Sequence, residues 1–217
     1  MKKLYILVEG QTELAFVKNV LWGYLSQFGI DVIARAVETS KKGGRPFRGG
    51  VTSYDKVKRD LTKWIKSSPG EYFTTMFDFY ALPTDFPGID SLHKLRGESA
   101  VKHLESALNS DIGYHNLIPY IQLHEFEALL FSDIQKLELE YPDKQCEIAQ
   151  LVNDVAGLTP EEINSKPETA PSKRILSRIP SYDKVTSGLN ITKEIGVEKL
   201  RRECPHFDSW IRAITSI

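Results

Sequence analysis

Apolar and polar positions follow two different periods along the first half of the chain. Strand-like runs, rich in β-branched and aromatic residues, fall at Lys3–Val8, Val32–Val37, Tyr72–Phe77 and Leu117–Leu123. Between them, apolar stripes with helical spacing predict helices over Thr12–Phe28, Ser53–Lys66 and Glu98–Leu108, the second capped by Ser53. Strands that alternate with helices favour a mostly parallel sheet of about four strands flanked by helices. The predicted fold class is therefore α/β.

The pattern changes after Phe131. Strand signals fade, and short helical pieces are interrupted by Pro142, Pro160, Pro167, Pro171, Pro180 and Pro205. We therefore expect an α/β domain over residues 1–131 and a helical C-terminal extension over residues 132–217, packed on it. The aromatic residues of CPHFDSWI, residues 204–211, are expected to lie in the core.

The composition is that of a globular protein, since 41% of the 217 residues are hydrophobic and 26% are charged. A formal net charge of -1 excludes a surface that is basic throughout, so any nucleic-acid surface must be a local patch. Cys146 and Cys204 lie far apart without a CxxC motif, which argues against a zinc site or a disulfide framework. The apolar run Leu4–Val8 is too short for a signal peptide or a membrane span. We expect a cytoplasmic protein that does not contact a membrane.

Two acids directly follow predicted strands. Glu9 lies in the strand-to-helix turn of LYILVEGQTELAFV, residues 4–17, and Asp78 lies where the strand in YFTTMFDFYALPTDFPG, residues 72–88, gives way to a loop. If these strands are parallel neighbours, the two carboxylates project from adjacent strand ends, one or two spacings of about 4.8 Å apart. Carboxylates this close repel unless a cation lies between them, and oxygen ligands suit Mg²⁺ or Mn²⁺. The predicted chemistry is phosphoryl transfer or phosphodiester hydrolysis.

Three further acids could complete this metal site. Glu13 lies in the first helical turn, where an acid can instead complement the helix dipole. In IPYIQLHEFEALLF, residues 118–131, a strand is followed by His124, Glu125 and Glu127. If a helix begins there, His124 and Glu127 share a face and Glu125 points elsewhere, which favours Glu127 over Glu125 as the ligand. His124 could equally hold a backbone group at the start of that helix.

Two basic segments are candidates for contact with phosphates. The segment ETSKKGGRPFRGG, residues 38–50, is predicted to be a loop whose glycines allow close approach to a sugar-phosphate backbone, or an ordinary solvated loop. Its basic residues are Lys41, Lys42, Arg45 and Arg48. In APSKRI, residues 170–175, the candidates are Lys173 and Arg174, with Arg178 one helical turn after Arg174. The segments contain neither a Walker A motif nor a GxGxxG motif.

The motif LVEGQTE, residues 7–13, followed by a strand that ends in Asp78, resembles the Toprim domain of topoisomerases, primases and OLD-family nucleases. Five motifs, VEGQTELAFV, GGVTSYDKVKRDL, MFDFYALPTDFPG, IPYIQLHEFEALLFSD and APSKRI, are together similar to a bacterial and archaeal Toprim-like family of unknown function, domain-of-unknown-function family 4276. The resemblance implies acid/base or metal chemistry for Glu9 and Mg²⁺ binding for Asp78. The second aspartate of the Toprim DxD motif is replaced by Tyr80. Either another acid compensates, with Glu127, Glu125 and Glu13 as candidates and Asp85 as a further one, or the site binds metal weakly and is not catalytic.

Three functions remain open from the sequence. The first is an Mg²⁺- or Mn²⁺-dependent nuclease acting on DNA or RNA, working with an ABC- or AAA-type ATPase encoded nearby in phage defence or in a mobile element, as the resemblance implies. The second is a non-catalytic interaction module that docks onto such an ATPase, which the Tyr80 replacement favours. The third is an enzyme that acts on small phosphorylated molecules with the same metal site.

Overall fold

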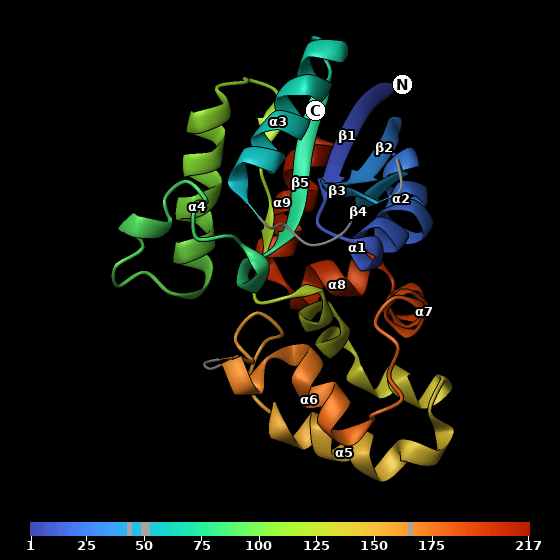
Figure 1. Ribbon diagram of the computed structural model, residues 1–217. Coiled ribbons are helices and arrows are strands. Elements are labelled where there is room, and N and C mark those ends of the chain that lie inside the picture. The colour runs from blue at the N-terminus through green and yellow to red at the C-terminus, as the bar shows by residue number, and fades with distance from the viewer. Residues whose placement is uncertain (43–44, 49–52, 165–166) are drawn as a thin grey trace.

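The structure of the chain, a computed structural model, describes residues 1–42, 45–48, 53–164 and 167–217. Its central sheet has the order β2-β1-β5-β6 (Figure 1), formed by Ile30–Ala36, Lys2–Val8, Tyr72–Asp78 and Leu117–Ile118, and β7 (Ile121–Gln122) also pairs with β5. Every pairing in this sheet is parallel. The α/β fold class predicted from the sequence is confirmed, and the first and third predicted strands are neighbours.

Strand β1 is buried on both of its faces. Leu4, Ile6 and Val8 enter one hydrophobic core, whereas Tyr5 and Leu7 enter a second core. Because consecutive side chains of a strand point to opposite faces, a strand covered on both sides needs an unbroken apolar run instead of an alternating one. The run from Leu4 to Val8 therefore identifies β1 as a central strand with helices on both faces.

Two long helices cover the face of the sheet that carries Tyr5. They are α3 (Tyr54–Ser67) and α4 (Gly97–Ile112), which contribute Val57 and Leu104 to the core around Tyr5. Helix α3 begins where predicted, but Ser53 at its N-cap makes no side-chain capping hydrogen bond. Asp85 takes this place, since its carboxylate oxygens accept the backbone N–H of Tyr54 at 2.9 and 3.1 Å.

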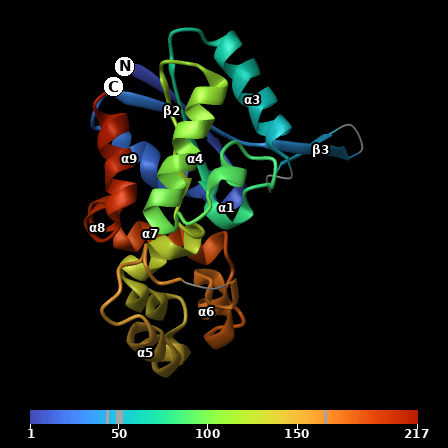
Figure 2. The same cartoon turned by 90° about the vertical axis from the view of Figure 1, so that its left-hand side faces the viewer.

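The opposite face is covered by helices from both ends of the chain (Figures 1 and 2). The N-terminal helix consists of α1 (Gln11–Phe16), a π-helical turn (Val17–Leu21) and α2 (Trp22–Ser26), and the C-terminal helix is α9 (Pro205–Thr215). Trp210 of α9 is buried and donates its indole N–H to Oγ1 of Thr74 in β5, at 2.8 Å. The expectation that the aromatic residues of CPHFDSWI lie in the core is confirmed.

The fourth predicted strand, Leu117–Leu123, is broken into two short strands. Pro119 has no N–H to donate to a sheet, so regular pairing stops between β6 and β7. The buried hydroxyl of Thr75 fills the gap, since it accepts the backbone N–H of Tyr120 at 2.9 Å and donates to the carbonyl of Tyr120 at 2.9 Å. Both short strands keep the same register against β5. The segment therefore continues along β5 to the carboxyl edge of the sheet despite the break.

The basic segment expected to be a loop is in part a two-stranded antiparallel ribbon. Strands β3 (Glu38–Lys42) and β4 (Arg45–Arg48) pair with each other and not with the central sheet. Figure 2 shows β3 extending away from the central sheet beyond α3. The glycines of the segment, residues 43–44 and 49–50, lie outside the described residues.

The rest of the chain is helical, as its prolines predicted. Its helices are α5 (Gln145–Asp154), α6 (Pro171–Arg178), α7 (Thr186–Ile195) and α8 (Val197–Glu203). Short 3-10 segments lie at Phe79–Ala81, Ile89–Ser91, Phe126–Ser132, Ile134–Leu139, Pro142–Lys144 and Pro167–Thr169. Figures 1 and 2 both place α5 and α6 beyond the carboxyl ends of the strands. Cys146 and Cys204 are free, and no helix in the described parts of the chain is long and apolar enough to cross a membrane.

Candidate functional site

The ends of β1 and β5 bring Glu9 and Asp78 together. Val8 is paired with Met76, and the backbone N–H of Glu9 continues this pairing with a 3.1 Å hydrogen bond to the carbonyl of Met76. The backbone N–H of Asp78 then donates to Oε2 of Glu9 at 3.2 Å. The two acids that the sequence singled out thus occupy adjacent strand ends at the carboxyl edge of the sheet, where open α/β sheets bind their ligands.

Glu13 reaches back from α1 into the same edge. Its Oε2 accepts the backbone N–H of Gly10 at 2.8 Å, so Glu13 forms part of the cap of its own helix. Burial and the negative charge of Glu13 together raise the pKa of Glu9 to about 7, against the hydrogen bond from Asp78 and the charge of Lys184. The pKa of Glu13 is also raised, mainly by burial. Glu13 therefore has a structural role at the cap and an electrostatic role beside Glu9.

Asp78 lies within electrostatic reach of three other acids of the edge. Burial holds its pKa well above the usual range, and the charges of Glu13, Glu9 and Glu127 add to the shift, against a hydrogen bond from the backbone of Phe126. Asp78 as a residue is partly exposed, but its Oδ1 is buried and has no hydrogen-bond partner among the described residues. A buried carboxylate oxygen without a partner is costly, so this oxygen marks the centre of the acidic site.

Glu125 and Glu127 lie close to each other and share one cation. Lys184, in the segment before α7, places its Nζ 3.3 Å from Oε1 of Glu127 and 3.6 Å from Oε2 of Glu125. Burial raises the pKa of Glu127 to about 7 even though Lys184 opposes the shift. Glu125 is held by α6, since its carboxylate accepts the backbone N–H of Ser172 at 2.6 Å and the Ser172 hydroxyl at 2.9 Å.

The helix expected to place His124 and Glu127 on one face does not begin at His124, and the preference for Glu127 over Glu125 as a ligand stays a prediction. His124 does not share a helical face with Glu127, because its φ is 66° and the helical segment starts only at Phe126. The imidazole turns instead toward the backbone, with Nε2 3.0 Å from the carbonyl of Glu161. Asp85 is not part of the acidic site either, because its carboxylate is occupied at the start of α3.

Lys184 was not predicted as a site residue from the sequence. Its motif, SYDKV, looks like an ordinary polar turn, and the acids that Lys184 contacts lie in a distant part of the chain. The pKa of Lys184 is raised by the charges of Glu127 and Glu125, which outweigh its desolvation. Lys184 therefore belongs to the site as a cation that partly balances the acids.

The chemistry of this donor set fits a divalent cation. Glu9, Asp78 and Glu127 supply carboxylate oxygens, and Oδ1 of Asp78 and Oε1 of Glu127 are buried without a hydrogen-bond partner among the described residues. Repulsion among these acids favours the arrival of positive charge. Within the described residues, however, no three His, Cys, Asp or Glu side chains are already grouped to hold a metal ion. Binding would therefore require the carboxylates to move toward one another.

The basic candidates are distributed outside this acidic edge. Lys41 and Lys42 lie on β3 and Arg45 and Arg48 lie on β4, but the structure does not describe their side chains. Lys173 is exposed on α6. The other two candidates from this helix bind protein groups: Arg174 donates to the carbonyls of Thr169 and Ile163 at 2.9 and 3.0 Å, and Arg178 pairs with Asp154 at 3.0 Å.

The match to a family model agrees with the motifs. The family described as "Domain of unknown function (DUF4276)" matches residues 8–215. The chain is similar to structures of the C-terminal region of the OLD protein of Xanthomonas campestris pv. campestris. The structure phased with mercury shows 16% identity over 98% of both chains with a TM-score of 0.42. The structure phased with platinum shows 16% identity over 98% of this chain and 95% of the other, with a TM-score of 0.40. No curated protein matches the chain.

Proposed function

The chain belongs to the DUF4276 family, and we propose that it is a metal-dependent phosphodiesterase that cleaves nucleic acid at the acidic edge of its sheet. The observation that carries this proposal is the state of Asp78. Its Oδ1 is buried without a hydrogen-bond partner among the described residues, and burial together with three neighbouring carboxylates raises the pKa of Asp78. A site of this kind is costly to maintain in a protein that never binds a cation there.

Each residue of the site has a separate part in the proposed reaction. Glu9, Asp78 and Glu127 would hold Mg²⁺ or Mn²⁺, which supplies charge stabilisation to the attacking and leaving oxygens of a phosphodiester. Lys184 is half-exposed beside Glu127, so its ammonium can also face a phosphate oxygen of the substrate. Glu13 keeps the turn after β1 in place through its hydrogen bond to Gly10. Glu9 and Asp78 are the catalytic residues of this proposal.

The acids account for catalysis, whereas substrate attraction requires basic groups. Lys41, Lys42, Arg45 and Arg48 on the ribbon of β3 and β4, together with Lys173, are the proposed contacts to the sugar-phosphate backbone. Arg174 is a weaker candidate, because its guanidinium is already bound to two carbonyls. The resemblance of the sequence motifs to ATPase-associated nucleases supports the proposal that the enzyme works with an ABC- or AAA-type ATPase in a phage-defence or mobile-element system.

A second candidate function is a non-catalytic module that docks onto the ATPase. Two observations favour it. Among the described residues no group of three ligands is ready for a metal, and Tyr80 stands where the Toprim motif has its second aspartate. The hydroxyl of Tyr80 lies 3.0 Å from Nδ1 of His124, so this residue does not replace the missing carboxylate.

Cleavage of labelled substrates tests the choice between the two functions. Purified protein, alone or with the ATPase encoded beside it, is incubated with Mn²⁺ or Mg²⁺ and with single-stranded DNA, RNA or plasmid. We expect cleavage that Asp78→Asn reduces by several orders of magnitude, because a lost metal ligand costs several kcal/mol in the transition state. Asp85→Asn, the same chemical change at a helix cap, is the matched control and should retain activity. Absence of cleavage under all these conditions, with ATPase binding that survives Asp78→Asn, would establish the docking module.

A further inference from the structure

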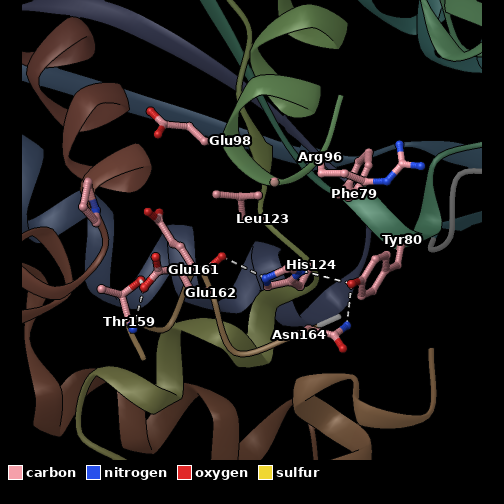
Figure 3. A pocket seen from close by; sticks show the side chains of 12 residues that line it. Phe79, Tyr80, Arg96, Glu98, Leu123, His124, Thr159, Glu161, Glu162 and Asn164 are labelled. Carbon is pink, nitrogen blue, oxygen red and sulfur yellow. Dashed lines mark hydrogen bonds between the residues drawn. The ribbon is translucent and has the colours of Figure 1, made fainter. Parts of the chain in front are cut away.

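A cavity of about 770 Å³ opens beside the acidic edge. The residues that line it are Phe79, Tyr80, Arg96, Gly97, Glu98, Leu123, His124, Thr159, Glu161, Glu162, Asn164 and Pro205 (Figure 3). Two of its walls are direct continuations of the segments that carry the acids, since Phe79 follows Asp78 and His124 precedes Glu125. Burial and the charge of Glu125 raise the pKa of Tyr80, so this acid lies within electrostatic reach of the cavity wall. The volume lies in the range of about 300–1,000 Å³ typical of small-ligand sites.

Aromatic rings form one side of the cavity. Tyr80 is 46% exposed although it is a large aromatic residue, and its ring lies 5.8 Å from that of Phe79 and 5.5 Å from that of His124. An exposed aromatic face in a concave site offers a planar ligand a surface for stacking. The replacement of an acid by Tyr80 thus exchanges a metal ligand for a stacking platform.

Hydrogen bonds hold the Tyr80 ring in one orientation. The carbonyl of Glu161 can only accept, so Nε2 of His124 carries the proton, and burial lowers the pKa of His124, which keeps the imidazole neutral. Nδ1 of His124 must then accept the O–H of Tyr80 at 3.0 Å, while the side-chain amide of Asn164 donates to the same phenol oxygen. Because the phenol is engaged on both sides, the ring face is what Tyr80 presents to a ligand.

The backbone of His124 and the wall segment that contains Glu161 are also held in place. His124 has a φ of 66°, a conformation that a non-glycine residue keeps only where its surroundings hold it. The carboxylate of Glu161 accepts the backbone N–H groups of His206 and Phe207 at 2.9 and 3.1 Å, which ties the segment of the wall to the start of α9. The shape of the cavity is therefore preformed.

Polar groups surround the aromatic side. Glu98, which pairs with Lys102 at 2.7 Å, and Glu162 carry acceptors that suit amino groups. Nη1 of Arg96 already donates to the carbonyls of His93 and Leu95, and its Nε and Nη2 carry further donors that suit carbonyl oxygens. Glu162 is positioned by Thr159, whose backbone N–H and hydroxyl donate to its Oε2 at 3.1 and 2.9 Å. A flat ring that bears amino and carbonyl substituents, which is the chemistry of a nucleobase, fits this combination.

We infer that this cavity receives one unpaired nucleobase, stacked on Tyr80, from a nucleic-acid strand whose phosphodiester lies at the acidic edge. This inference rests on the proposed function and specifies its substrate class. A base inside a duplex cannot enter a pocket without leaving its stack, so the substrate is single-stranded or unpaired at the cleavage point.

The inference is tested by measuring equilibrium binding of oligonucleotides in the presence of EDTA. EDTA removes the divalent ions, so binding is measured without cleavage. A labelled single-stranded oligonucleotide is compared with the matching duplex, with an abasic strand of the same length and with a mononucleotide. We expect the single strand to bind best, and Tyr80→Ala to weaken its binding about tenfold, whereas Tyr80→Phe, which keeps the ring, restores most of the affinity. Tyr80→Ala should leave binding of the abasic strand unchanged. Phe28→Ala, a change at a 50% exposed ring on another part of the surface, is the matched control.

The outcomes distinguish the inference from the proposed function. If Asp78 is required for cleavage but Tyr80→Ala changes neither binding nor KM, the base site is wrong and the phosphodiesterase stands. If no single strand binds, if the abasic strand is equally sensitive to Tyr80→Ala, or if the mononucleotide binds as tightly as the strand, the inference is also overturned. Ring-dependent binding of the strand that is unaffected by Asp78→Asn supports the base site even where cleavage is absent. Melting temperatures of all variants report whether each remains folded.

Discussion

The backbone N–H of Asp78 donates a 3.2 Å hydrogen bond to Oε2 of Glu9, so a backbone donor joins the two neighbouring acids. The bond orients the Glu9 carboxylate and lowers its pKa, but burial and the charge of Glu13 act more strongly in the opposite direction. At the carboxyl edge of the sheet, hydrogen bonds thus hold the acids in place although burial and mutual repulsion disfavour their charged forms. This combination is typical of sites in which function and stability conflict.

The first prediction concerns the pH dependence of stability without metal. The pKa of Glu9 rises from 4.5 to about 7 on folding, so the folded state binds this proton more tightly than the unfolded state. The free energy of unfolding should therefore fall as pH rises from about 4.5 to about 7, by an amount on the order of 1–3 kcal/mol. Glu9→Gln should lose less stability over this range, which urea unfolding in EDTA at a series of pH values would measure. The exposed Asp143→Asn is the control, and identical pH profiles for wild type and Glu9→Gln would contradict the prediction.

The second prediction concerns Lys184 as an internal cation. Lys184→Met removes the positive charge beside Glu127 and should destabilise the metal-free protein by about 1 kcal/mol, a modest value because Lys184 is half-exposed. The same change should increase the stabilisation produced by Mn²⁺, since the ion no longer competes with an ammonium for the carboxylates. Melting temperatures with and without Mn²⁺ measure both effects. Lys173→Met, at an exposed lysine of α6, should show neither effect. A smaller response to Mn²⁺ in Lys184→Met would be evidence against a shared cation site.

The third prediction separates two aspartates that are close in the sequence. Asp85→Ala removes the acceptor for the backbone N–H of Tyr54 and should cost about 1 kcal/mol, as other helix-cap deletions do. Its melting temperature should still rise with Mn²⁺ as in the wild type. Asp78→Asn should lose little stability or gain some, because it removes a buried negative charge, but its melting temperature should no longer respond to Mn²⁺. If both variants respond equally to the ion, Asp78 is not a ligand.

The fourth prediction concerns the interruption of the sheet. Thr75→Val keeps the shape of a buried side chain but leaves the backbone N–H and carbonyl of Tyr120 without their partner. We expect a loss of about 1–3 kcal/mol in unfolding free energy, the usual cost of a buried group left unpaired. Thr62→Val, at a partly exposed position of α3, is the control and should change stability little. A loss in Thr75→Val no larger than in the control would show that the hydroxyl is not needed there.

The strands, and the acids Glu9 and Asp78 at their ends, could be predicted because the sequence signals for them are local. The apolar run Leu4–Val8 followed by Glu9 specifies a buried strand and the turn at its end, and the same reasoning applies to the strand that ends at Asp78. The break at Pro119 also has a local cause, but its repair by Thr75 does not. That hydroxyl acts across the sheet, on a residue that sequence patterns do not connect with it.

The sequence by itself determined the α/β class, the order of the elements and two acids at strand ends, because hydrophobic period and turn chemistry act over a few residues. The tertiary structure decided which acids share a cation, because Lys184 meets Glu125 and Glu127 only when the segment before α7 folds over the edge of the sheet. It also decided that Tyr80 offers a ring face beside the acids, through hydrogen bonds with His124 and Asn164 from separate segments. Burial and charge depend on distances in space, which a linear pattern does not contain.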